Sequence, residues 1–207
     1  MIPVFFIVTM MLVVWISYQK HRTERIAEAK REAFWEKERL ANTIRKKDIS
    51  NLDYITVPVE NLPFPETGNE EVTDIQNYIL KLSTMKIVNF TGITNTDLKL
   101  QYGAPNINLL MEFDKNYMEL VRYLYRYGKL LYERGLVAEA TAILEFGLSI
   151  GTDVSANYTL LATIYKEKNE AERIDFVISC AEKLTSLTKK SLLTALMAIR
   201  DSAVSGQ

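Results

Sequence analysis

Side chains that commonly carry catalysis or bind metals are scarce in this chain. Histidine and cysteine each occur once, as His21 and Cys180. Zinc sites and activated serine or cysteine nucleophiles combine a histidine with further ligands or with a nucleophile. One histidine and one distant cysteine give almost no way to build such sites, and a lone cysteine cannot form an intrachain disulfide. The sequence therefore predicts no catalytic residue, no metal site and no cofactor.

Carboxylates are the remaining candidates for acid–base chemistry. Asp97, Glu112, Asp114 and Glu119 lie in the middle of the chain. Their spacing does not resemble a metal-binding loop, and charged residues on helix faces are usually just solvated. We therefore expect the protein not to be an enzyme.

The N-terminal region is apolar and is followed by basic residues. The first eighteen residues carry no charge. Residues 2–18 would form roughly 26 Å of helix at ~1.5 Å per residue, the short end of what a hydrocarbon core of ~30 Å requires. The sequence thus predicts a transmembrane helix at 1–18, which contacts the bilayer through residues 2–18. Anionic lipids are expected to bind near Lys20, Arg22 and Arg25. A cleaved signal peptide is the main alternative, although no basic residue precedes the apolar run.

The positive-inside rule gives this anchor an orientation. The basic cluster follows the apolar run, so the N-terminus is expected outside and the rest of the chain in the cytoplasm, as in a single-pass protein of the cell membrane. Residues 19–47 form a charged juxtamembrane helix with ten Lys/Arg and five Glu, which leaves about −6 for the remainder of the chain. That acidic remainder argues against nucleic-acid binding. A solvated stalk, a weak coiled coil and a membrane-surface helix all remain open for 19–47.

Breaks in the helical pattern divide the rest of the chain. Residues 48–71 contain three prolines and a glycine and are expected to form a linker whose apolar residues dock along the domain. Residues 72–120 are expected to form a helical and irregular N-terminal cap region. Residues 189–207 are expected to form a C-terminal capping helix and tail.

From Val121 onward the chain repeats itself with a period of 34 residues. Residues 121–154 align with 155–188, and matched positions share their size class. The matched pairs are Leu124 and Tyr158, Gly128 and Ala162, Leu131 and Tyr165, Leu144 and Ile178, and Gly147 and Ala181. Small residues let antiparallel helices approach to ~8–10 Å, and the large residues around them fill the remaining space. The pattern predicts two helical hairpins and an all-α fold.

This repeat resembles the tetratricopeptide family in length and in its small and large positions. The resemblance covers about a third of the chain. It departs from the family pattern at Thr152 and Ser186, where proline is usual, and at Ile174, where a small residue is usual. It implies a small solenoid of two tetratricopeptide-like repeats at 121–188, which the flanking helices would cap.

The resemblance also implies a partner groove on the first helix of each repeat. By family position, the residues that face this groove are Arg122, Tyr125, Lys129, Tyr132, Thr159, Thr163 and Lys166. A basic and aromatic groove would suit an acidic or aromatic peptide segment, whereas a plain solvated helix face is the alternative. Some family members clamp a C-terminal carboxylate, but Lys129 and Thr163 do not reproduce that clamp.

Two further expectations follow from the apolar spacing before and within the first repeat. Tyr117 and Tyr127 fall on core positions and are expected to pack in the interior. Gly128 is expected at the closest helix crossing, where the family pattern also tolerates alanine.

Taken together, the sequence predicts a membrane-anchored module that faces the cytoplasm and binds a protein or peptide partner. The alternative is a structural or accessory subunit of a membrane protein complex.

Overall fold

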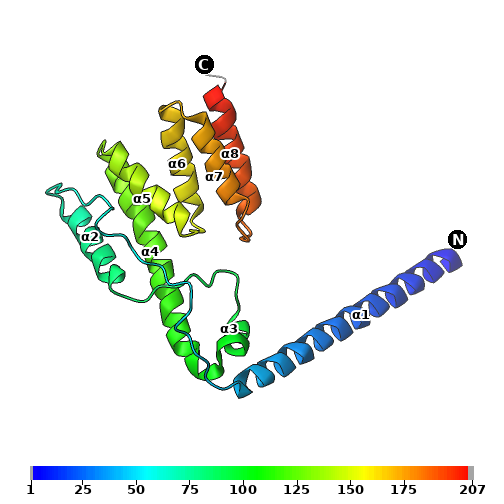
Figure 1. Cartoon of the computed structure of the whole chain (residues 1–207). Coiled ribbons are helices and arrows are strands. Elements are labelled where there is room, and N and C mark those ends of the chain that lie inside the picture. The colour runs from blue at the N-terminus through cyan, green and yellow to red at the C-terminus, as the bar shows by residue number, and fades with distance from the viewer. Residues whose placement is uncertain (1, 205–207) are drawn as a thin grey trace. The chain divides into compact units, whose positions relative to one another are not determined.

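The structure is a computed structural model that describes the backbone of residues 2–204 and the side chains of residues 5–203. Met1 and the end of the predicted C-terminal tail, 205–207, lie outside this description. The described residues form eight α-helices, a short 3-10 helix and no β-strand, so the all-α prediction is confirmed for them (Figure 1). The elements are α1 (Ile2–Thr43), α2 (Glu70–Ser83), α3 (Asn95–Tyr102), η1 (Ala104–Asn106), α4 (Ile107–Glu133), α5 (Val137–Ser149), α6 (Ser155–Glu167), α7 (Ala171–Ala181) and α8 (Lys189–Val204).

The chain divides into two compact units, each built from segments that are distant in sequence. The first unit comprises Met1–Asp48 and Thr94–Ile107, and the second comprises Ile49–Ile93 and Asn108–Gln207. Residues 94–107 are predicted to belong to a single cap region, 72–120. In the structure these residues pack instead with the end of α1.

Ion pairs join α1 to α3 in the first unit. Lys37 Nζ lies 2.5 Å from Asp97 Oδ1, and Glu38 accepts hydrogen bonds from Lys99 and from the Thr96 hydroxyl. The Lys99 ammonium group, through its hydrogen bond, is the main cause of the lowered pKa of Glu38. These pairs fix α3 against α1 although the partners lie about 60 residues apart in the chain.

A glycine allows the backbone to pass closely at the base of this unit. Gly103 has φ +92°, and an added Cβ would lie 2.2 Å from the Arg45 carbonyl oxygen. Backbone hydrogen bonds run from Lys47 N to the Tyr102 carbonyl and from Ala104 N to the Ile44 carbonyl. Only glycine fits this position, because both the dihedral angle and the space exclude a side chain.

The structure corrects the prediction of a membrane anchor at 1–18. Among the residues searched, those that the structure describes, no helix is both long and apolar enough to cross a membrane. The uncharged run from Phe5 ends at Gln19, and α1 continues without a break into the charged residues that follow. An 18-residue stretch that begins at Phe5 therefore takes in Lys20 and Arg22. The prediction of a single-pass protein in the cell membrane, with the N-terminus outside, is therefore also wrong.

In the second unit, the proline-containing segment lies against the helices. Val57 and Leu62 are buried in the core, and Tyr54 forms an isolated antiparallel bridge with Val88. Helix α2 begins after Asn69, whose side chain accepts a hydrogen bond from Val72 N at 3.1 Å and so caps the helix. The buried face of α2 consists of Val72, Ile75, Ile79 and Leu82.

Helix α4 runs unbroken from Ile107 to Glu133, across the point where the sequence analysis separates the cap region from the first repeat. No proline lies within it, so nothing interrupts its hydrogen bonding. It is followed by α5, α6, α7 and α8, which pack together in chain order. Helix α8 packs on both α6 and α7 and occupies the range where a terminal capping helix is predicted.

Candidate functional site

The predicted groove residues lie on two helices of the second unit. Arg122, Tyr125, Lys129 and Tyr132 belong to α4, and Thr159, Thr163 and Lys166 belong to α6. Their spacings of three, four and seven residues place each set on one helix face. We call this set of seven residues the basic face. All seven are exposed or partly exposed.

Part of the basic face is already occupied by contacts within the protein. The Tyr132 hydroxyl donates to Glu167 Oε1 at 2.7 Å, which joins α4 to α6. This hydrogen bond to a carboxylate raises the pKa of Tyr132. Lys129 Nζ lies 3.6 Å from Glu133 Oε1, and the Thr159 and Thr163 hydroxyls bond to backbone carbonyls of their own helix.

The other three side chains of the basic face keep their donors free. Arg122, Tyr125 and Lys166 make no side-chain hydrogen bond or ion pair with any residue that the structure describes. Two exposed methionines, Met111 and Met118, extend the same face along the N-terminal half of α4, because they precede Arg122 by eleven and four residues. These methionines were not among the predicted groove residues, because the first repeat was predicted to begin only at Val121. The absence of a helix breaker between Ile107 and Val121 was the signal that could have found them.

The two tyrosines predicted to pack in the core do so, and this prediction is confirmed. Tyr117 and Tyr127 are 1% and 0% exposed. The Tyr117 hydroxyl donates to the Gly151 carbonyl at 2.7 Å, and the Tyr127 hydroxyl donates to the Pro63 carbonyl at 2.8 Å. Burial raises the pKa of both hydroxyls. They lock the surrounding loops onto α4 and are not part of the basic face.

A second surface, which was not predicted, lies between α5 and α7. Two adjoining hollows of about 960 and 550 Å³ share the side chains of Leu148, Ser149, Phe176 and Cys180. Phe176 is 61% exposed although it is a large aromatic residue. We call this surface the Phe176 hollow. Its sequence signal is weak, since a single exposed aromatic on a helix is common.

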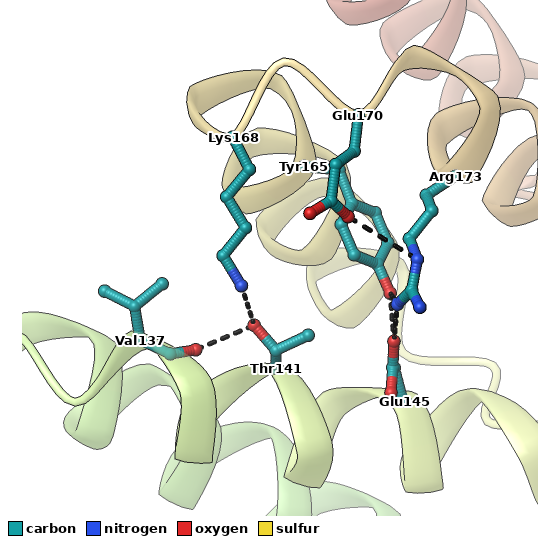
Figure 2. Close-up of polar contacts among 7 residues, drawn as sticks. All are labelled: Val137, Thr141, Glu145, Tyr165, Lys168, Glu170 and Arg173. Carbon is teal, nitrogen blue, oxygen red and sulfur yellow. Dashed lines mark hydrogen bonds and ion pairs between the residues drawn. The ribbon is translucent and has the colours of Figure 1, made fainter.

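A polar cluster forms one rim of the Phe176 hollow (Figure 2). The Tyr165 hydroxyl and the Arg173 guanidinium both donate to the carboxylate of Glu145, and the Arg173 guanidinium also lies 5.3 Å from the centre of the Tyr165 ring. Burial and the Glu145 carboxylate together raise the pKa of Tyr165. Beside them, Lys168 donates to the Thr141 hydroxyl at 3.3 Å. The cluster joins α5, α6 and α7 and holds this rim in place.

The rest of the hollow carries free charges. Asp53, Asp153, Glu172 and Lys183 line it, and none of them forms an ion pair or a side-chain hydrogen bond with another described residue. Apolar side chains thus line both parts of the hollow, and unpaired acidic residues outnumber unpaired basic ones in its lining.

Three of the four middle carboxylates, Asp97, Asp114 and Glu119, have separate structural partners and do not form a shared site. Asp97 pairs with Lys37, Asp114 accepts a hydrogen bond from Phe90 N at 3.2 Å, and Glu119 accepts one from the Tyr78 hydroxyl. Among the described residues, no group of three His, Cys, Asp or Glu side chains is placed to hold a metal ion.

The described residues form an all-α protein with these two separate surfaces. Comparison with protein-family models, curated proteins and solved structures finds no match.

Proposed function

We propose that the hairpins of α4 to α8 form a tetratricopeptide-like interaction module that binds an acidic segment of a partner protein along the basic face. The observation that carries this proposal is the set of unpaired donors on Arg122, Tyr125 and Lys166. Arginine and tyrosine are enriched in protein interfaces, and lysine adds positive charge that attracts an acidic partner.

The exposed methionines of α4 support the same proposal. Met111 and Met118 are 47% and 52% exposed and lie in line with Arg122. Methionine is also enriched at binding surfaces, and its flexible side chain adapts to different apolar partners. A partner segment that follows α4 would meet apolar contacts first and basic contacts further along the helix.

The rigidity of the helices beneath the basic face lowers the cost of binding. Leu124, Tyr127 and Leu131, which lie on the opposite side of α4, are all fully buried. A surface fixed before binding loses little conformational freedom when the partner arrives.

Charge reversal of the free basic residues tests the proposal. The variant Arg122→Glu/Lys166→Glu is compared with the control Lys30→Glu/Arg39→Glu, which makes the same charge change at exposed positions of α1. The full-length chain is used as bait in a quantitative co-purification from its host cells. We expect an acidic partner to be retained by the wild type and by the control and to fall at least about tenfold with the α4/α6 variant. Equal recovery by both variants would contradict the proposal, provided that their melting temperatures agree with the wild type.

A further inference from the structure

We propose that the Phe176 hollow is a second docking surface, which takes a partner-protein segment with a bulky apolar side chain flanked by lysine or arginine. This inference does not rest on the basic face, which consists of other residues and carries the opposite charge.

The hollow contains an apolar stripe that is only partly covered. Phe176, Cys180 and Leu184 follow one another at four-residue spacing along α7 and the turn after it, so they form one stripe. Leu148 of α5 adds to this stripe from the side. Phe176 remains 61% exposed, so a partner that covers it would remove further apolar surface from water, which favours association.

The dimensions suit a side chain of a peptide segment. Ligand pockets in proteins are typically ~300–1,000 Å³. The larger hollow of about 960 Å³ falls within that range, and the adjoining one of about 550 Å³ prolongs it past Phe176. An extended segment can therefore place one bulky side chain in the hollow and continue along α7.

The charges at the edges determine the flanking residues of this segment. Asp53 and Asp153 line the larger part and Glu172 lines the smaller part, all without an ion-pair partner. Lys183 is the one unpaired basic residue that lines the hollow in the described part of the chain. Cationic side chains on either side of the apolar anchor would pair with these carboxylates, whereas an acidic segment would be repelled.

Hydrogen bonds hold the walls of the hollow in place. The Tyr158 hydroxyl donates to the Thr152 carbonyl at 2.8 Å, and Tyr117 fixes the neighbouring turn through the Gly151 carbonyl. At the opposite rim, Arg173 and Tyr165 are both bonded to Glu145. The hollow is thus formed in the absence of a partner, which favours binding because little ordering is needed.

The test is a selection of random phage-displayed peptides on the full-length chain, followed by fluorescence anisotropy with the enriched peptides. We expect a consensus of a large apolar residue next to lysine or arginine. Phe176→Ser should weaken binding of that peptide at least about tenfold, as expected for an anchor at the centre of an interface. Asp53→Asn/Asp153→Asn should weaken it less and should reduce its salt dependence.

Matched variants separate this surface from the basic face and from general damage. Met197→Ser removes a large exposed apolar side chain from α8, and Arg122→Glu/Lys166→Glu alters the basic face. Both should leave the affinity within about twofold. The proposal is overturned if no peptide is enriched, if the enriched peptides are acidic, or if Phe176→Ser binds as the wild type does. Because the two surfaces are altered separately, loss of one activity leaves the other measurable.

Discussion

The two hairpins follow one sequence pattern but close in different ways. In the α4–α5 hairpin, a Cβ added to Gly128 would lie 2.8 Å from both Cγ and Cδ2 of Leu144. In the α6–α7 hairpin, the matching residue is Ala162, which is fully buried together with Ile174. The comparison teaches that the same position of the 34-residue pattern leaves no free space for a Cβ in the first hairpin, whereas the second hairpin holds a fully buried alanine there.

The hairpins also differ in what covers them. Helix α2 lies beside α4, where the Tyr78 and Tyr123 rings stack at 4.2 Å and Gln76 donates to the Tyr127 hydroxyl (Figure 1). The second hairpin is covered by α8, which leaves Phe176 of α7 exposed. Helix α2 therefore covers part of α4 in the first hairpin, whereas α7 of the second hairpin keeps a large aromatic side chain exposed.

The largest expected effect is overpacking of the tighter crossing. Gly128→Leu should destabilise the full-length chain by ~1–3 kcal/mol or more, because the added side chain would overlap the fully buried Leu144. Lys129→Leu, one residue away and exposed, should cost far less. Thermal melts of both variants decide the matter. Equal melting temperatures would mean that the first hairpin does not cross at Gly128.

The next largest effect is a loss of stability at high pH, which we expect from ionisation of the buried Tyr158 in the second hairpin. Burial raises the pKa of Tyr158 to about 12, above the ordinary value of 10.0. Because the neutral hydroxyl is the form that the fold favours, its contribution is fully present below pH 10 and is lost as the pH rises toward 12. At about 1.4 kcal/mol per pKa unit, ionisation of Tyr158 should lower the free energy of unfolding by ~2–3 kcal/mol. Urea midpoints measured from pH 8 to pH 12 should fall less steeply for Tyr158→Phe, and parallel curves would show that this hydroxyl is not buried.

The smallest effect concerns exchange of the two crossing residues. Ala162→Gly should cost ~1–2 kcal/mol, since it adds a helix-interior glycine and removes a buried methyl group. Gly128→Ala gains ~1 kcal/mol of helix propensity but must displace Leu144, so we expect a net change below about 1 kcal/mol toward destabilisation. The sequence-based expectation that alanine fits freely at this position is thus revised by the 2.8 Å approach. Urea denaturation of both variants would contradict this account if Gly128→Ala were clearly the more stable protein.

Much of the second unit could be predicted from local pattern. The small residue at Gly128 and the large residues around it place the first crossing correctly, and the apolar spacing at Tyr117 and Tyr127 identifies them as core. These features depend on neighbours three and four residues apart, which the sequence displays directly.

Other features depend on contacts that no local pattern reveals. The pairing of α3 with α1 rests on Lys37 with Asp97 and on Glu38 with Lys99, residues that any helix surface carries. The Phe176 hollow forms only where the 53–56 segment meets the end of α5 and α7. The prediction of a membrane anchor was wrong because it rested on the uncharged run alone and did not consider the charged helix that continues from it.

The most direct test of the central claim, that the basic face binds a partner, is site-specific photo-crosslinking in the host cell. A photoreactive phenylalanine analogue replaces Tyr125 in the full-length chain, and Leu80, which is exposed on α2, serves as the control position. We predict that position 125 crosslinks to an acidic segment of one partner protein and that this product disappears when Arg122→Glu/Lys166→Glu is added. Equal products from positions 125 and 80, or a product from 125 that survives the charge reversal, would contradict the account.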